Sequence, residues 1–425
     1  AREGRRLLSA SAAAAAATAP LAATHLGVLS PAGLVANLVF VPVTGLLVLP
    51  AALLSAGAAL APPSALADGL VSTCAALAAL TCDAVSWTAA RLPDPPPVAA
   101  PRASVLLACA LLALAATRAR GLSWRIAACL LSTLLLALAS PAPVTPEPPR
   151  AVFLDVGQGD ATLVQGSGCT LLLDAGLALE GGPDLGRSVV LPALAALGVG
   201  RLDVLAVSHA DADHAGGAAA VLETWPVGEL WLPAGGAHEV DFEALRRRAL
   251  AVGVPVRWVD GSSASVLLGD LRITPLAPSR GATRRGNDGS LVLRVEAGGA
   301  SLLLPGDVEA AGERALLDAR VPLASDVLKL AHHGSSTSSA APLLSAVAPR
   351  FAVASAACGG RFGMPHPDVV ARLEAAGIPW AWTGRDGAVI VPLHGNLGWR
   401  GQRAEPARCT PGGRRASGWP RRQRP

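Results

Sequence analysis

The sequence predicts an α+β protein in two parts, an apolar helical membrane region followed by a domain of stacked β-sheets covered by helices. Composition predicts the first part, because 52% of the 425 residues are hydrophobic and only 16% are charged, which is unusually apolar for a soluble chain. Periodicity predicts the second part, because short β-type runs alternate with helical patterns from Ala151 onward.

The N-terminal region contains the first candidate membrane segments. No Asp, Glu, Lys or Arg occurs between Arg6 and Asp68, and this stretch is long enough for two spans, since one span needs about 20 residues. Leu34–Gly57 is the best candidate for a single span. Leu66–Ala90 contains Asp68 and Asp83 and therefore fits an interfacial amphipathic helix better.

A second apolar block, Ala103–Val144, precedes the layered domain. Three arginines and Trp124 interrupt it and predict a hairpin with a cytoplasmic turn, by the positive-inside rule. The chain then emerges on the outer side of the membrane, where the five prolines of Pro141–Pro149 predict a semi-rigid linker. We therefore expect a membrane region over 1–140, a linker over 141–150, a layered domain over 151–400 and a disordered basic tail over 401–425.

Charge and cysteine content argue against several classes of protein. The chain has a net charge of +4, but its segment Arg400–Pro425 alone has eight arginines and one glutamate. The rest of the chain is therefore slightly acidic and lacks the basic character of a strong nucleic-acid surface. The seven cysteines include no Cys-x-x-Cys pair, which argues against a disulfide framework and a zinc ribbon. The chain begins at Ala1 and enters an apolar run at once, so we expect that an N-terminal part is missing.

The segment Ser208–His214 concentrates potential metal ligands. It follows a buried-looking strand, Leu202–Val207, and places two imidazoles and two carboxylates at one strand-to-helix turn. Burying so many acceptors is costly unless a cation compensates them, and mixed His and Asp ligands suit zinc, manganese or iron. An exposed polar turn with incidental histidines is the weaker alternative.

Two further strands end in residues of the same kind. Asp307 follows the apolar run Ser301–Leu304, and His332 and His333 follow Asp326–Leu330. Each is weak evidence alone, since an Asp at a strand end is often only a turn former. Strand ends on one edge of a sheet converge, however, so a shared metal site is the better interpretation.

With these motifs in hand, residues 151–400 resemble the metallo-β-lactamase-type domain of the ComEC family of competence proteins, and the apolar region resembles the end of that family's channel domain at Leu34–Leu38 and Val41–Pro50. The resemblance implies a transmembrane α-helical segment followed by a metallo-β-lactamase-type αββα sandwich. The motifs that carry it in the second domain are Asp155–Asp160, Leu173–Gly176, His209–His214, Asn287–Leu293, Leu304–Asp307 and His332–Ser335.

The resemblance also implies a ligand set and one or two divalent ions, zinc or manganese, with magnesium as a third candidate. His332 and Asp213 are the expected catalytic residues, with His332 facing the substrate phosphate, although the sequence leaves open which of His332 and His333 binds metal. The implied ligands are His209 and Asp211 for the first ion, Asp213, His214 and His333 for the second, and Asp307 as the bridge between them.

Other residues are expected to support the site. Asp174 resembles an acid that braces the histidine loop. Asp160 and Gln158 lie on a loop that could reach the same edge, but a plain hairpin turn explains that loop equally well. Lys329 could contact phosphate, although a solvated lysine on an edge strand is favoured about two to one.

Two departures from the superfamily pattern bear on the metal. Asp211 stands where the middle histidine of the loop is expected, which shifts the preference toward manganese or magnesium. The third histidine of the first site is missing, because only Asn287 and Asp288 precede the Leu291 strand. The first ion is therefore expected to be weakly held or absent.

The leading functional hypothesis is a DNA-uptake channel component of a bacterial inner membrane, multi-pass, whose extracytoplasmic domain hydrolyses the DNA strand that is not imported. Its expected partners are single- or double-stranded DNA, the lipid bilayer, further copies of itself and other competence machinery. The alternatives are a membrane-tethered phosphodiesterase or esterase acting on a small substrate, and a metal-binding gating module without catalysis.

Overall fold

The computed structural model describes residues 49–59, 65–89, 149–236, 239–279, 286–394, 397–403 and 406–413. The chain divides into two compact units, Ala1–Ala142 and Pro143–Pro425, which are described separately. The expected hairpin Ala103–Val144 and most of the expected span Leu34–Gly57 lie outside the described residues.

Two helices are described in the first unit, α3 (Leu49–Ala59) and α4 (Ala65–Ala89), and they contact each other. Helix α4 contains Asp68 and Asp83 and covers almost the whole of the segment for which an interfacial helix was expected. None of the helices in the described ranges combines the length and the apolar character that crossing a membrane would require.

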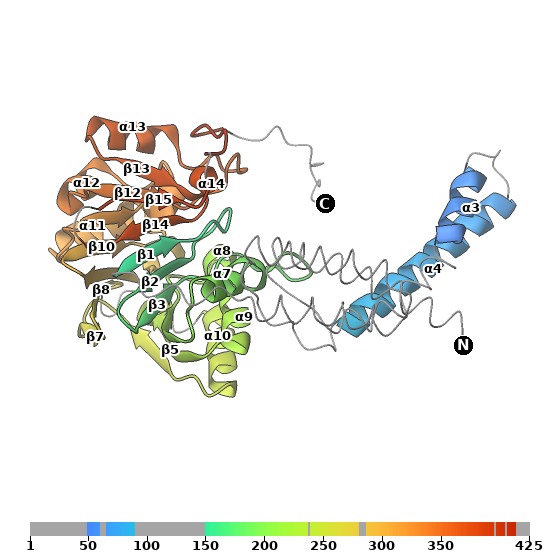
Figure 1. Cartoon of the computed structure of the whole chain (residues 1–425), viewed down its shortest axis with the longest axis horizontal. Helices are drawn as coiled ribbons and strands as arrows, with labels where there is room; N and C mark the ends of the chain where they lie inside the picture. Colours follow the sequence, from blue (N-terminus) through green and yellow to red (C-terminus); the bar gives the residue numbers. More distant parts are fainter. Residues whose placement is uncertain are drawn as a thin grey trace, which may run out of the picture. The chain divides into compact units, whose positions relative to one another are not determined.

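The second unit is built on two β-sheets (Figure 1). The first has the strand order β15-β14-β1-β2-β3-β4-β5-β6 and the second β13-β12-β11-β10-β9-β8-β7. The strands of the first sheet are β1 (Arg150–Phe153), β2 (Thr162–Gln165), β3 (Thr170–Leu173), β4 (Leu202–Ala206), β5 (Val227–Pro233), β6 (Val256–Val259), β14 (Val389–Pro392) and β15 (Arg400–Gly401). Those of the second are β7 (Val266–Leu268), β8 (Leu271–Ala277), β9 (Val292–Ala297), β10 (Ala300–Leu304), β11 (Val327–Lys329), β12 (Phe351–Ala354) and β13 (Trp380–Trp382).

Helices cover the outer face of each sheet (Figure 1). The first sheet carries α7 (Leu191–Ala196), α8 (Ala212–Ala215), α9 (Ala218–Thr224) and α10 (Val240–Ala251), and the second carries α11 (Ala310–Asp318), α12 (Ala341–Val347) and α13 (Pro367–Ala375), with the short α14 (Thr383–Asp386) after β13. Short 3-10 and π-helical turns lie at Gly186–Val190, Ala234–Gly236, Gly286–Gly289 and Ala331–Gly334.

The alternation of side chains along each strand builds this layered core. In β1, Ala151 and Phe153 pack between the two sheets, whereas Val152 packs against the helices of the first layer. In β10, Leu302 and Leu304 face the other sheet. Because successive side chains of a strand point to opposite faces, one apolar run fills two cores. The order helix, sheet, sheet, helix matches the αββα sandwich expected from the resemblance.

The strands that carry chemistry are parallel to their neighbours. Strand β4 pairs in parallel with β3 and β5, and β11 pairs in parallel with β10 and β12. Their carboxyl ends therefore meet at one edge of each sheet, and the loops that follow them deliver Asp174, the histidine loop, Asp307 and His333. The expected convergence of strand ends is confirmed in this respect.

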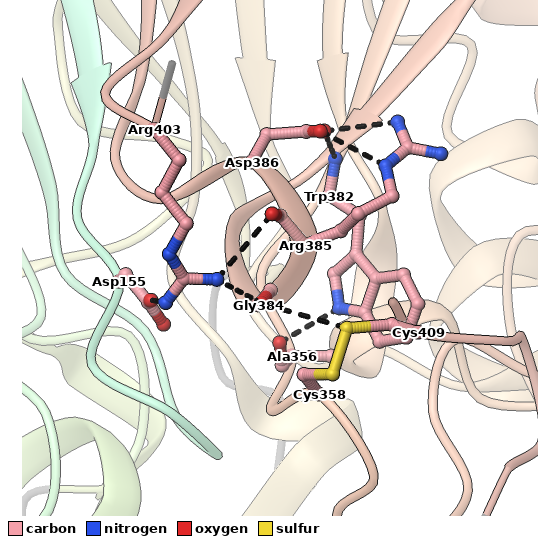
Figure 2. The surroundings of a disulfide bond; sticks show 9 residues. All are labelled: Asp155, Ala356, Cys358, Trp382, Gly384, Arg385, Asp386, Arg403 and Cys409. Carbon is pink, nitrogen blue, oxygen red and sulfur yellow. Dashed lines mark hydrogen bonds and ion pairs between the residues drawn. A yellow bond between two sulfur atoms is a disulfide. The ribbon is translucent and has the colours of Figure 1, made fainter. Parts of the chain in front are cut away.

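The segment that follows β14 differs from the expectation. The tail was predicted to be disordered from residue 401, but residues 400–403 and 406–413 form β15, backbone hydrogen bonds and a disulfide bond between Cys358 and Cys409 (Figure 2). Arg403 also contacts Asp155 at 2.8 Å. The absence of a Cys-x-x-Cys pair argued against a disulfide framework, but it did not reveal this single bond, whose two cysteines lie 51 residues apart. No local spacing pattern could pair them.

Candidate metal centre

Four buried side chains converge at the edge where the parallel strands end. Asp160, His214, Asp307 and His333 each offer one potential ligand atom, and these atoms all lie within 4.8 Å of one another. They come from four separate segments, the β1–β2 loop, the turn after β4, the loop after β10 and the turn after β11. The fold, rather than any local motif, assembles the cluster.

The turn after β4 positions the first histidine. Asp174 accepts hydrogen bonds from the Ser208 backbone N–H at 2.7 Å and from the Ser208 hydroxyl at 2.8 Å. The other end of the turn is held by His214, whose Nδ1 lies 2.8 Å from Asp174 Oδ2. Because an ionised carboxylate only accepts, Nδ1 carries a proton, so Nε2 is the nitrogen that can offer a lone pair to a metal ion once its own proton is displaced. Asp174 is thus the expected brace.

The second histidine is held in the same way. His333 Nδ1 donates to the carbonyl oxygen of Ser355 at 3.0 Å, which again leaves Nε2 to face the cluster. His332 and His333 both have positive φ, 48° and 56°, in a turn of non-helical geometry. Residues without a glycine's freedom are rarely held there, and such backbone strain is concentrated at functional sites.

The two free imidazole nitrogens and two carboxylates surround one point. His214 Nε2 and His333 Nε2 lie 3.3 Å apart, and Asp307 Oδ2 lies 3.2 Å and 3.1 Å from them. Asp213 Oδ2 lies 3.5 Å from His333 Nε2. Two nitrogens and two oxygens at such separations are a donor set that suits zinc or manganese.

His332 stands apart from this donor set. Its Nε2 is 3.9 Å from Asp307 Oδ2, its Nδ1 is 2.9 Å from Glu309 Oε1, and its side chain keeps 20% of its surface exposed. Burial lowers the pKa of His332, so that it is a neutral imidazole at neutral pH. The structure therefore gathers His333, and not His332, with His214.

His209 and Asp211, the residues expected to bind the first ion, are not both directed into the site. His209 Nε2 lies 3.7 Å from Asp211 Oδ2, but the Asp211 side chain is 58% exposed. His209 itself is buried, its ring packs 4.1 Å from that of His214, and its Nε2 has no hydrogen-bond partner. A buried nitrogen without a partner, beside the donor set above, is what a nearby cation would satisfy. The residues present therefore fit a divalent ion.

The carboxylates and imidazoles shift the pKa values of one another. Burial by itself lowers the pKa of His333, but the carboxylates of Asp307 and Asp160 outweigh burial and raise it to about 9. Against burial, Asp307 and Asp174 likewise raise the pKa of His214 well above its usual value. Burial raises the pKa of Asp213, but contact with His333 prevails and lowers it to about 2. Protons and metal ions compete for these imidazoles.

Asp160 is closer to the centre than expected. Its backbone N–H donates to Asp213 O at 3.1 Å, which packs the loop onto the histidine turn. A Cβ on Gly159 would lie 2.4 Å from Asp213 O, so only glycine permits this approach. The plain hairpin turn therefore does not describe the loop. Gln158 extends from it toward Met364, whose sulfur lies 3.5 Å from Gln158 Nε2.

Lys329 is buried, which makes the interpretation as a solvated edge lysine wrong. Only 2% of its surface is exposed, and its ammonium group contacts Asp160 and Asp307. Strand β11 is not an edge strand, because it pairs with β10 and β12. In this strand Leu328 packs against the helix layer and Val327 faces the other sheet, so Lys329, two residues after Val327, falls on an interior face as well.

Asn287 and Asp288 occupy the place of the missing third histidine but have other contacts. Asp288 Oδ1 accepts from the backbone N–H groups of Glu309 and Gly312, each at 2.8 Å, at the start of α11. Asn287 Nδ2 donates to Glu309 Oε1 at 3.3 Å. Both residues therefore anchor α11 and Glu309, which in turn lies against His332.

Two family models match the chain. The model described as "Competence protein" matches residues 1–121, and the model described as "Metallo-beta-lactamase superfamily" matches residues 154–357. The second match contains Asp160, the whole histidine turn, Asp307 and His333.

Three relatives are similar to more than half of the chain. Competence protein ComA of Neisseria gonorrhoeae is 35% identical over 77% of this chain and 44% of its own length. ComE operon protein 3 of Bacillus subtilis is 31% identical over 58% of this chain and 33% of its own length. Recombination protein 2 of Haemophilus influenzae is 36% identical over 52% of this chain and 26% of its own length. The chain thus spans less than half the length of these relatives. With a competence-protein domain followed by a metallo-beta-lactamase domain, it belongs to the ComEC family.

Proposed function

We propose that the second unit is a metal-dependent phosphodiesterase that hydrolyses DNA as part of DNA uptake, and that Asp213, His214, Asp307 and His333 hold its divalent ion. One observation carries this proposal. The free Nε2 atoms of both histidines and Oδ2 of Asp307 lie 3.1–3.3 Å from one another. Histidines held at Nδ1 and open at Nε2 are typical of metal ligands.

The catalytic roles follow from what is exposed. A divalent ion in this position would supply positive charge for the negative charge that develops on a phosphate in the transition state. Asp213 and His332 keep 29% and 20% of their side-chain surface exposed, so the substrate approaches from their side. His332 is a neutral imidazole at the exposed side of the site, which suits it to take a proton from the attacking water.

The cellular setting is part of the proposal. The Cys358–Cys409 disulfide supports an oxidising compartment, since such bonds are rare in the bacterial cytoplasm. This agrees with a multi-pass protein of the inner membrane whose second unit faces outward. Single- or double-stranded DNA is the proposed substrate, with the lipid bilayer, other copies of the chain and further competence proteins as partners.

A second candidate function is a metal-binding gating module without catalysis. The exposure of Asp211 favours it, because the first-ion pair is then weak and only one ion remains for chemistry. A tethered phosphodiesterase or esterase for small substrates is a third candidate.

Hydrolysis by residues 1–425 in detergent micelles separates the candidates. We expect Mn²⁺-dependent cleavage of a labelled DNA oligonucleotide that EDTA abolishes and that Asp213→Asn lowers at least a hundredfold. Asp241→Asn, an exposed acid in the first turn of α10, serves as the matched control and keeps full activity. Equal cleavage by Asp213→Asn would reject the nuclease. Cleavage of bis(p-nitrophenyl) phosphate alone supports a small-substrate enzyme, and metal binding without any hydrolysis supports gating.

A further inference from the structure

We propose that the metal centre holds one divalent ion and that the ammonium group of Lys329 is a built-in cation in place of a second ion. The inference rests on the metal site of the proposed function but does not require that the substrate is DNA. It concerns the number of ions, which the sequence leaves open between one and two.

The two oxygens of Asp307 face different partners. Oδ2 lies 3.2 Å and 3.1 Å from the Nε2 atoms of His214 and His333, where the ion would bind. Oδ1 lies 3.5 Å from Lys329 Nζ. A carboxylate that bridges two ions presents an oxygen to each of them. Here the second oxygen is directed at an ammonium group.

The Lys329 ammonium group has a full set of acceptors. Besides Asp307 Oδ1, it contacts Asp160 Oδ2 and lies 3.3 Å from the carbonyl oxygen of Gly306. An ammonium group has three N–H donors, so each donor has one acceptor. Lys329 is therefore neither free to swing toward solvent nor available to a substrate phosphate.

Charge balance supports a single ion. Asp160, Asp174 and Asp307 are buried, with 2%, 1% and 3% of their surface exposed. Buried carboxylates need compensating charge, because the low dielectric of the interior penalises a net charge. One ammonium group and one divalent ion supply three positive charges against these three buried carboxylates. The proposed ligand Asp213 adds one negative charge, but its side chain is 29% exposed and solvent can screen it. A second divalent ion would be balanced only if Asp213 and the 58% exposed Asp211 both served it.

Lys329 is also held in place by its strand. Strand β11 is hydrogen-bonded to β10 on one side and β12 on the other, and Lys329 pairs with Val353 in the register of β12. Leu328 and Leu330 pack into the core beneath the helices. Moving the backbone of Lys329 would break the hydrogen bonds of β11 to β10 and β12. A second ion would therefore have to displace the ammonium group while the strand stays in place.

The number of ions bound tests the inference directly. Residues 1–425 in detergent micelles are dialysed against increasing Mn²⁺, bound manganese is counted by elemental analysis, and electron paramagnetic resonance distinguishes isolated from paired ions. We expect one magnetically isolated Mn²⁺ per chain at saturation. Two ions with an exchange-coupled spectrum would overturn the inference alone, whereas no bound ion would overturn the proposed function with it.

A variant tests the role of Lys329 itself. Lys329→Met keeps most of the unbranched side chain and removes the ammonium group, so Asp160 and Asp307 Oδ1 are released and a second Mn²⁺ should bind. Arg314→Met, which removes an exposed positive charge on α11, should still bind one. A Lys329→Met variant that folds and binds a single ion would contradict the proposal.

Chemical labelling gives a readout that needs no variant. Lys329 is the only lysine of the chain, so an amine-reactive reagent followed by peptide mapping reports on it alone apart from the N-terminus. We expect Lys329 to stay unlabelled in the folded chain both with EDTA and with saturating Mn²⁺, and to label fully in denaturant. Labelling that appears only with Mn²⁺ would mean that ions displace the ammonium group, and the inference would fail.

Discussion

Asp174 Oδ2 lies 2.8 Å from His214 Nδ1, although the two residues are 40 positions apart in the chain. Asp174 has a positive φ of 62°. Its carboxylate also accepts hydrogen bonds from the backbone N–H and the hydroxyl of Ser208, so it holds both the start of the histidine turn and the imidazole of His214 at the end of that turn. The orientation of His214 Nε2 toward Asp307 depends on this contact.

Replacing Asp174 with Asn should therefore weaken metal binding rather than unfold the domain. The amide keeps the shape of the carboxylate but loses its charge, and changes of this kind typically reduce metal affinity about 10- to 100-fold. Titration calorimetry with Mn²⁺ measures the change. Asp326→Asn is the control, because it also replaces a carboxylate that accepts hydrogen bonds from a distant residue, the backbone N–H and hydroxyl of Ser301. This variant should bind Mn²⁺ normally. Unchanged affinity in Asp174→Asn would contradict the proposed ligand geometry.

The metal-free chain should lose stability as pH rises from about 6.5 toward 9. The pKa of His333 is about 9 in the folded state against an ordinary value of 6.5, so the folded state binds more protons than the unfolded state within this window. The stabilisation is complete below the unfolded pKa and is lost as pH passes the folded pKa, at about 1.4 kcal/mol for each pH unit between them. Thermal unfolding with EDTA at pH 6 and pH 9 measures it, and a higher Tm at pH 9 would contradict it.

Metal binding should release protons near neutral pH. Since the pKa values of His214 and His333 are both raised, both imidazoles carry a proton that a metal ion must displace. We expect about two protons released per Mn²⁺ at pH 7.5, measured with a pH indicator in weak buffer. His333→Ala should release fewer. Binding without proton release would show that these imidazoles are not ligands.

Two neighbouring glycines offer a matched pair of substitutions. Gly159→Ala places a methyl group 2.4 Å from Asp213 O, whereas a Cβ on Gly157 meets nothing within 4 Å. Gly157 has a φ of 67°, so Gly157→Ala should cost only the backbone penalty of about 1–2 kcal/mol. Gly159→Ala should in addition push Asp160 and the histidine turn apart and lower Mn²⁺ affinity at least tenfold. Equal metal binding by the two variants would refute this packing.

The disulfide should stabilise the domain and be absent in a reducing environment. Closing a loop of 51 residues stabilises a fold by about 4 kcal/mol on the chain-entropy account. Cys358→Ser/Cys409→Ser should lower Tm, and reductant should then have no further effect on this variant. If reductant fails to lower the Tm of the natural chain, the bond does not form.

The orientation in the membrane can be tested independently. A phosphatase reporter that is active only in the periplasm, fused after Pro149 near the start of the second unit, should be active in cells if the proposed location holds. The disulfide and the basic turn predicted within Ala103–Val144 both favour that location. A cytoplasmic reporter that is active at the same junction would overturn the proposed location.

Much of the site could be predicted from local patterns. The sequence of the histidine turn, Asp307 at a strand end and the paired histidines all identify strand-end ligands, because alternation and turn residues are local properties of the chain. The brace by Asp174 was also expected. Local patterns could not predict which of His332 and His333 binds the metal, because both follow the same strand. Only their contacts distinguish them, that of His333 with Ser355 and that of His332 with Glu309.

By itself the sequence determined the order of strands and helices, the layered fold and the residue types that meet at one edge, because hydrophobic period and turn chemistry act over a few residues. Only the tertiary structure decided that Lys329 is an interior cation, that Asp160 lies beside the proposed ligands and that Cys358 pairs with Cys409. Each of these depends on which strand is central and which distant loop packs on it. Such contacts join segments far apart in the chain, and their energy comes from burial and charge pairing that no short stretch of sequence contains.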